Sequence, residues 1–355
     1  MFYREAGQFR TSYAQDAQLL PLRQDRIGMG VMLIVAFAVV PFLAGDYWLS
    51  AILIPWLALS LVVMGQNILM GYAGQLSLGS AGFMAVGAFA CYNFILRVDG
   101  IPFLVALFLS GVCAALVGIV FGLPSLRIRG LYLAVATLAS QFFIVWVVYK
   151  FGWFKNYDAS GVITAQSIVI FGHTFASPYE KYLVVLAIVA ALALAARNMA
   201  RGRTGRAWMA VRDMDVAAEV MGLSLLRTKL EAFAISSFYC GVGGALFAFA
   251  YLQVVEPSAF TIELSFRILF MIIIGGIGTI LGCFLGAGFV LLLPVFLNVF
   301  FHAVIGQAVD ASLASALEQV IFGVVIIIIL IVEPRGLAQL WQLTKERLRL
   351  WPFSH

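Results

Sequence analysis

The chain has 355 residues, of which 63% are hydrophobic and 11% are charged, and its formal net charge is +5. Soluble globular domains are about half apolar and about one quarter charged, so this composition excludes a water-soluble protein. A basic excess this small gives no indication of a nucleic-acid partner. Since a helical span needs roughly 20 apolar residues, the chain has room for about ten spans and one substantial loop. We predict an all-α, multi-pass integral membrane protein that lies in a lipid bilayer.

The first segment of the chain precedes every apolar run and carries charges of both signs. It contains Arg4, Glu5, Arg10 and Asp16, and it is too long and too mixed to be the short basic region of a signal peptide. We interpret residues 1–26 as an N-terminal arm, residues 27–338 as the transmembrane domain and residues 339–355 as a C-terminal tail.

Apolar runs bounded by charged or turn residues are the predicted transmembrane helices. They lie at roughly Ile27–Ala44, Leu49–Met70, Ala81–Leu96, Ile101–Phe121, Leu131–Tyr149, Tyr182–Ala196, Ala232–Leu252, Ile268–Ile280, Cys283–Val304 and Leu317–Val332. Basic residues are retained on the cytoplasmic side of a membrane. With the N-terminus inside, 17 of the 22 Lys and Arg residues fall on that side. This distribution predicts an even number of spans and cytoplasmic termini.

Two turns between predicted spans contain no charge, GYAGQLSLGSAG at residues 71–82 and GGIGTILG at residues 275–282. Irregular backbone at membrane depth persists only where it is buried in protein or lines a wet cavity, so both turns are candidates for the translocation path. Close helix packing through small residues is the alternative. The residues assigned to the path are Gly74, Gln75, Ser77, Gly79, Ser80, Gln141, Gly275, Gly276, Gly278 and Thr279. The amides within spans, Gln66, Asn67, Gln141 and Asn298, either line the path or form interhelical hydrogen bonds.

The loop at residues 197–230 is the only predicted cytoplasmic connection long enough to hold structured elements. It predicts one short helix from about Gly205 to Met221, which Gly222 ends in a left-handed conformation, and a second short helix that leads through Lys229 into the next span. A rigid helix across the mouth of a membrane domain is a surface that another protein can push. Its charges, on Arg212, Asp213, Asp215 and Glu219, would orient such a partner. A helix that merely packs on lipid headgroups is the alternative.

The sequence gives no sign of catalytic chemistry. No Lys follows a Gly, so the chain has no phosphate-binding P-loop, and its energy must come from a partner or an ion gradient. No His or carboxylate pair has metal-ligand spacing, and no Ser lies in a nucleophile elbow. An ion-coupled secondary transporter is an alternative, but such proteins usually carry an ionisable residue inside a span. Here Glu231 and Arg267 lie at span ends.

The stretch GRAWMAVRDMDVAAEVMGLSLLRTKL resembles the cytoplasmic loop of the branched-chain (hydrophobic) amino acid ABC permeases. The positions that match include Arg206, Ala207, Met221, Gly222 and Lys229. Further matching blocks are GQLSLG at 74–79, LRIRGLYLAVATLA at 126–139, IIGGIGTILGCFLGA at 273–287 and EPRGLA at 333–338. The order and spacing of these blocks resemble the LivM-like member of a pair of permeases. Asp213, Met214 and Asp215 depart from the family's usual Glu-Asn-Glu.

The resemblance implies a permease subunit of an ATP-driven ABC importer in a bacterial inner membrane. The implied partners are a second homologous permease, two ATP-binding cassette subunits and a periplasmic substrate-binding protein. ATP and Mg are then held by the partner subunits, with no cofactor or metal on this chain. The implied cargo is a branched-chain or other hydrophobic amino acid, and urea or aromatic or short organic acids are alternatives. The resemblance also implies that the loop docks in a groove of the ATPase subunit.

Overall fold

The computed structural model describes residues 23–126, 130–158, 163–166, 168–170, 173–305, 320–321, 323–328, 331 and 336–350. Within this part of the chain eight helices are long and apolar enough to cross a membrane. They are Trp48–Tyr72, Ser80–Arg97, Phe103–Gly122, Tyr132–Lys150, Pro178–Arg201, Leu225–Leu252, Pro257–Gly275 and Ile280–Leu297. The prediction of an all-helical membrane protein is confirmed. The last predicted run, residues 317–332, lies mostly outside the described residues.

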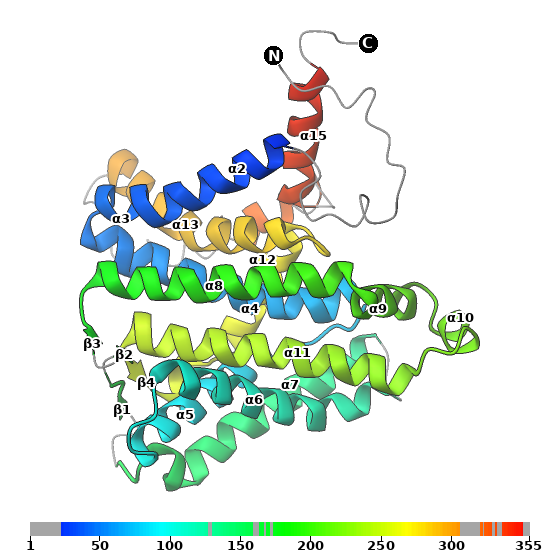
Figure 1. Ribbon diagram of the computed structural model, residues 1–355, viewed down its shortest axis with the longest axis horizontal. Helices are drawn as coiled ribbons and strands as arrows, with labels where there is room; N and C mark the ends of the chain where they lie inside the picture. Colours follow the sequence, from blue (N-terminus) through cyan, green and yellow to red (C-terminus); the bar gives the residue numbers. More distant parts are fainter. Residues whose placement is uncertain are drawn as a thin grey trace.

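The helices follow the predicted runs in chain order (Figure 1). Those before the long loop are α2 (Arg23–Ile34), η1 (Val35–Val39), α3 (Val40–Leu43), η2 (Trp48–Leu53), α4 (Ile54–Asn67), η3 (Ile68–Tyr72), α5 (Ser80–Arg97), α6 (Phe103–Gly122), η4 (Leu123–Leu126), α7 (Leu131–Lys150), η5 (Gly152–Lys155) and α8 (Pro178–Arg201). The others are α9 (Arg203–Asp213), α10 (Asp215–Val220), α11 (Leu225–Leu246), η6 (Phe247–Leu252), η7 (Pro257–Ala259), α12 (Ile262–Gly275), α13 (Ile280–Ile305) and α15 (Leu337–Leu350).

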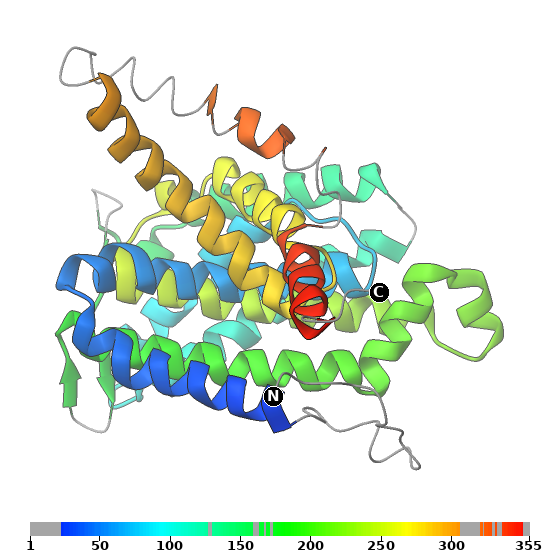
Figure 2. The ribbon, with the colours of Figure 1, turned by 90° about the horizontal axis from the view of Figure 1, so that it is seen from above.

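Helix α12 begins six residues before the predicted span at Ile268. The side chain of Thr261 accepts a hydrogen bond from the backbone N–H of Leu264 at 3.4 Å and so caps the helix. Glu263 and Arg267 therefore lie inside the first two turns of α12, although charge was used to place the span boundary. Figure 2 shows α13, which follows α12, crossing the bundle obliquely.

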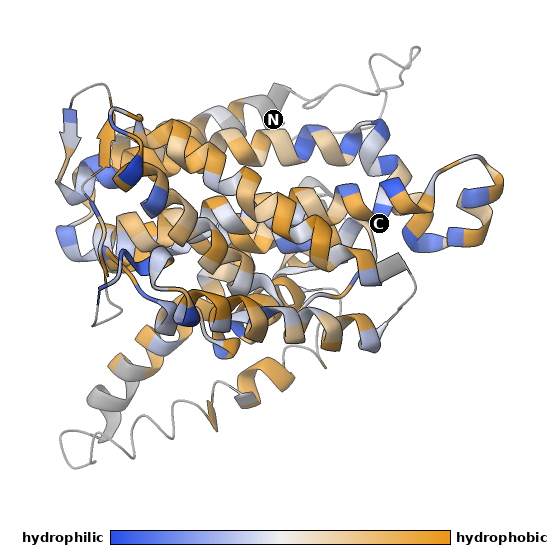
Figure 3. Ribbon diagram, turned by 90° about the horizontal axis from the view of Figure 1, so that it is seen from below, coloured by the Kyte–Doolittle hydropathy of each residue, from blue (hydrophilic) through white to orange (hydrophobic). Residues whose placement is uncertain are grey.

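The core is centred on α11, which packs against α4, α5 and α6. Two glycine contacts explain the close approach of these helices. A Cβ on Gly87 of α5 would overlap the backbone of Gly241 in α11, and a Cβ on Gly244 would overlap the backbone of Met84. Small residues at helix crossings let backbones approach closely in membranes, where van der Waals packing replaces much of the hydrophobic driving force. Figure 3 shows the matching distribution of hydropathy, with hydrophobic helix bodies and hydrophilic residues gathered near the ends.

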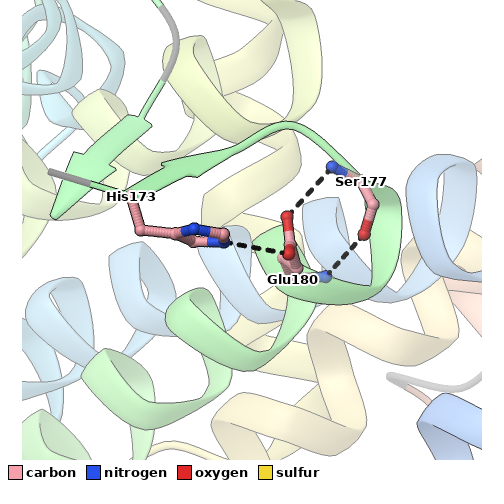
Figure 4. Close-up of polar contacts among 3 residues, drawn as sticks. All are labelled: His173, Ser177 and Glu180. Carbon is pink, nitrogen blue, oxygen red and sulfur yellow. Dashed lines mark hydrogen bonds and ion pairs between the residues drawn. The ribbon is translucent and has the colours of Figure 1, made fainter.

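The end of the bundle opposite α9 and α10 carries two small antiparallel sheets. Strand β1 (Ile163–Thr164) pairs with β4 (Val254–Val255), and β2 (Ile168–Ile170) pairs with β3 (His173–Phe175). Helix α8 then begins with a capping box, in which Ser177 Oγ accepts from Glu180 N and Glu180 Oε2 accepts from Ser177 N, each at 3.3 Å. His173 Nε2 lies 3.2 Å from Glu180 Oε1 (Figure 4), so the second hairpin is tied to the start of α8.

Candidate functional site

The two uncharged turns, far apart in the sequence, meet at one side chain. Asn67, the last residue of α4, donates from Nδ2 to the carbonyl oxygen of Thr279 at 3.2 Å. Its Oδ1 accepts from the backbone N–H of Gly278 at 2.8 Å. The Asn67 side chain is buried, and a Cβ on Gly71 would lie 2.6 Å from Gly278 N. One buried amide therefore joins the end of α4 to the turn that precedes α13, and Gly71, at the start of the first turn, lies against both partners.

The irregular part of each turn is shorter than the uncharged sequence. Tyr72 still belongs to η3, Ser80 starts α5, and Ile280 starts α13. The positive φ angles are +67° at Gly74, +114° at Gly276 and +81° at Gly278, a region that other residues adopt only with strain. Gly275 is the last residue of α12, where a Cβ would overlap the carbonyl of Gly282, so this glycine serves helix packing.

Most polar side chains predicted to line the path are bonded within the protein. Gln66 donates to the Ser77 carbonyl, and Ser77 Oγ accepts from Gly79 N at 3.3 Å. Gln141 of α7 accepts at 2.6 Å from the hydroxyl of Ser265 in α12. The Gln141 bond joins α7 to α12, and the Gln66 bond joins α4 to the first turn. In the second turn, the Thr279 hydroxyl donates to the carbonyl of Gly276 at 2.9 Å.

Gln75 and Ser80 differ from the other predicted path residues. The Gln75 side chain is only 5% exposed, yet neither its amide nitrogen nor its oxygen has a hydrogen-bond partner among the described residues. The buried hydroxyl of Ser80 also lacks one there. A buried polar group without a partner costs about 1–3 kcal/mol, so native proteins seldom leave one unused. Gln75 and Ser80 are therefore the polar groups of the first turn whose hydrogen-bonding capacity the described residues leave unused.

A cavity of about 610 Å³ separates the first turn from the long loop. Gly74 and Gln75 form one wall, and Arg212, Asp215 and Lys229 contribute charged groups of both signs to the others. Lys229 is buried and belongs to α11, which runs unbroken from Leu225, so the predicted separate short helix before that span is wrong. Ser224 caps this longer helix by accepting from Arg227 N at 3.5 Å.

The predicted single helix of the long loop is two helices. The chain leaves α9 after Asp213 and starts α10 at Asp215, because Met214 adopts an extended conformation with φ −153° and ψ 95°. Aspartate is unfavourable within a helix and favourable in a first turn, which explains a break between two of them. Arg212 and Glu219 therefore lie in different helices, although the prediction placed both in one helix. The remaining predicted loop residues lie in α9 (Arg206, Ala207) or follow α10 (Met221, Gly222).

Gly222 ends α10 as predicted, with φ +86° and no neighbouring atom within 4 Å of the point that a Cβ would occupy. Its backbone N–H donates to the carbonyl of Glu219 at 2.9 Å. The left-handed conformation, and not crowding, is therefore what requires glycine at this position.

Arg212 connects the loop to the two turns. Its Nη1 donates to the carbonyl of Gly71 at 2.7 Å, and its Nε and Nη2 lie 2.9 and 2.8 Å from Asp213 Oδ1. The side-chain stem lies against Gly74, where a Cβ would come within 2.6 Å of Arg212 Cγ. A continuous path of contacts therefore leads from α9 through Gly71 to Asn67 and on to Gly278.

Helix α10 exposes an apolar surface that the sequence analysis missed. Met214, Val216, Val220 and Met221, here called the α10 knob, are 71%, 68%, 85% and 71% exposed. Figure 1 shows α10 projecting beyond the end of the bundle. The prediction emphasised the charges of this loop. The signal in the sequence for an exposed apolar surface was the presence of four large apolar residues in a segment outside the spans. Within the described residues no cluster of His, Cys, Asp or Glu is placed to hold a metal ion.

Comparison with known proteins places these features in a family. Residues 48–330 match the family described as "Branched-chain amino acid transport system / permease component". The chain is 31% identical over 239 residues to the high-affinity branched-chain amino acid transport system permease proteins LivM of Escherichia coli and of Salmonella typhimurium, which covers 61% of this chain and 56% of each relative. It is 22% identical over 327 residues to a probable LivM of Methanocaldococcus jannaschii, covering 81% of this chain and 93% of that protein.

The chain thus spans little more than half the length of the two bacterial relatives. No solved structure matches it. Because the family match covers most of the chain and includes both turns and the long loop, the chain belongs to the branched-chain amino acid transport permease family.

Proposed function

We propose that this chain is one of two homologous permease subunits of an ATP-driven importer, and that its α10 knob docks in a groove of the ATPase subunit. Family membership supports the transport class. The exposed knob carries the proposal, since a group of large apolar side chains exposed outside the spans is typical of a protein-contact surface. Under this proposal α9, α10 and both termini are cytoplasmic, two ATPase subunits hold ATP and Mg, and the membrane is the bacterial inner membrane.

The contacts of Arg212 support a route for coupling. A movement of α10 is transmitted through the short α9–α10 junction to Arg212, whose guanidinium holds the Gly71 carbonyl. The displacement of η3 then reaches the second turn through Asn67. Both turns border the proposed path, so one push at the knob moves the segments between α4 and α5 and between α12 and α13 together.

The proposed cargo is a branched-chain or other hydrophobic amino acid. The names of the relatives support this class, and the unpaired groups of Gln75 and Ser80 support polar contacts to its charged ends. Neutral amide and hydroxyl groups can replace water around these ends without trapping the molecule through a fixed charge. A periplasmic binding protein supplies most of the selection. Competition of leucine uptake by urea, aromatic acids and short organic acids, in complexes with the cognate binding protein, distinguishes the alternatives.

Docking of the knob is tested by a matched pair of substitutions. Full burial of a valine side chain contributes about 1.5–3 kcal/mol. Val220→Asp replaces this contribution with a carboxylate at the proposed contact, and it should release the ATPase subunits during purification. Val169→Asp, at an exposed valine in β2 at the other end of the bundle, should retain them. Co-purification of ATPase with both variants would show that the knob is not the contact. ATP-independent uptake by the isolated chain, driven by an ion gradient, would instead support a secondary transporter.

A further inference from the structure

A second cavity, of about 550 Å³, lies between α5, α6 and α7 and has no part in the proposed coupling route. We call it the α5–α7 groove. Its walls are almost entirely apolar and aromatic, and they include Phe89, Phe94, Cys113, Val117, Phe143 and Val147. The volume is in the range of ligand sites, roughly 300–1,000 Å³. A groove of this composition suits a hydrocarbon chain.

The helices that flank the groove also carry large apolar side chains on their outer surfaces. Phe108 and Val120 of α6 are each 61% exposed, and Phe142 and Trp146 of α7 are 59% and 55% exposed. Both helices are long and apolar enough to cross the membrane. The surface that contains the α5–α7 groove is therefore compatible with contact to lipid along its length.

One cation stands at the end of this apolar groove. Arg97, in the last turn of α5, donates from Nε to Asn93 Oδ1 at 3.0 Å and from Nη2 to the Trp153 carbonyl at 2.9 Å. Its guanidinium lies 4.0 Å from the centre of the Trp153 ring. These contacts fix the guanidinium at the end of a span, the depth at which tryptophan and lipid headgroups meet. Two of its five N–H donors make the two hydrogen bonds.

The segments near Arg97 carry mixed charge, with Lys150 at the end of α7, Lys155 at the end of η5, and Asp99 and Asp158 in the adjacent loops. Within the lining of the α5–α7 groove, however, Arg97 is the charged residue, and no carboxylate is present there. A zwitterionic amino acid would find a charged partner for its carboxylate but no charged partner for its ammonium group. A molecule with one anionic group and a long apolar chain satisfies both the guanidinium and the walls.

We propose that the α5–α7 groove is a phospholipid site, in which one acyl chain lies against α5, α6 and α7 and the lipid phosphate binds Arg97. The site belongs to the leaflet on the side away from α10, since α5 runs from the first turn at Ser80 to Arg97 at the opposite end of the bundle. The proposal does not depend on the ATPase docking or the cargo proposed above.

The test uses the complete transporter reconstituted with phosphatidylglycerol that carries a photoreactive diazirine near the end of one acyl chain. Adducts should map to α5, α6 and α7 at the groove-lining residues. Val117→Trp, which fills the groove, should abolish them, whereas Val120→Trp, on the outer surface of the same helix, should not. Arg97→Gln removes the charge without removing the walls. It should raise the mole fraction of the lipid at half-maximal labelling by about tenfold, as expected for a lost charge-assisted hydrogen bond.

Three results would overturn the proposal. Labelling that is uniform over the outer surfaces of α6 and α7, and unchanged by Val117→Trp, would mean that the lipid is only part of the bulk bilayer. Labelling that hydrophobic amino acids displace would make the α5–α7 groove a cargo entrance. Groove residues that react with lipid in the isolated chain, but are shielded in the complete transporter, would show that a partner subunit covers the groove. Arg97→Gln tests the site independently of Val117→Trp, because it removes a charge and does not insert a bulky side chain into the groove.

Discussion

Replacement of Arg212 by Ala tests the connection between the long loop and the two turns. The substitution removes two interactions of unequal strength. The ion pair with Asp213 joins side chains that are 38% and 65% exposed, and such surface pairs contribute about 0–1 kcal/mol. The hydrogen bond from the guanidinium to the Gly71 carbonyl is partly buried, and a bond from a charged donor contributes about 1.5–3 kcal/mol. The second interaction should therefore dominate the effect of the substitution.

The assay is the stimulation of ATP hydrolysis by loaded binding protein in reconstituted complexes, measured together with cargo uptake. A loss of about 2 kcal/mol of coupling in Arg212→Ala corresponds to a decrease of roughly thirtyfold in both rates. Asp213→Asn is the matched control, because it removes the ion pair and leaves the bond to Gly71; its rates should fall less than about fivefold. Equal effects of the two substitutions, or normal stimulation in Arg212→Ala, would refute the proposed route.

The remaining predictions concern single contacts. Asn67→Leu leaves the partly buried Gly278 N–H without its acceptor and should lower the free energy of unfolding by about 1–3 kcal/mol. Asn67→Asp keeps that acceptor, so the unfolding midpoint of the purified complex should fall less in the Asp variant. Gly222→Val should reduce uptake, because a residue with a side chain pays about 1–2 kcal/mol for the left-handed conformation that Gly222 adopts. Gly222→Asn should retain uptake, and equal uptake by the two variants would contradict this reasoning. Gly87→Ala should destabilise the α5–α11 crossing by about 1–3 kcal/mol, while Gly30→Ala, with no atom nearby, should not.

The sequence was sufficient to predict those features that depend on local composition. Eight of the ten predicted apolar runs correspond to the candidate spans of the described residues. Gly222 was correctly assigned as a left-handed helix end because its effect depends only on its own backbone. The break at Met214 was not predicted, since an alanine-rich segment favours a helix while the two flanking aspartates act only through their positions relative to helix ends. The early start of α12 was missed for a related reason, because the Thr261 cap outweighed the charges used as a boundary.

Contacts between distant segments were beyond the reach of this reasoning. The sequence indicated that both uncharged turns border a path, but not that Asn67 joins them, because an amide in a span has many possible partners 200 or more residues away. The bond from Arg212 to Gly71 spans 141 residues and leaves no periodic signal. Pattern analysis assigned both Gln75 and Gln141 to the path, with an interhelical hydrogen bond as the alternative for Gln141. Their surroundings separate them, because Gln141 is held by Ser265 and Gln75 has no partner among the described residues.

The bonds of Asn67 reach only backbone atoms of the second turn, the N–H of Gly278 and the carbonyl of Thr279. Backbone N–H and C=O groups do not depend on the side chain, so apart from Gly71 and Gly278 this contact places little demand on the residues that surround it. A mutation that changes a side chain along the path can then alter which molecule is carried while the two turns stay fastened. The cargo specificity of such a protein can therefore change during evolution without loss of the contact between the two turns, provided that residue 67 remains an amide.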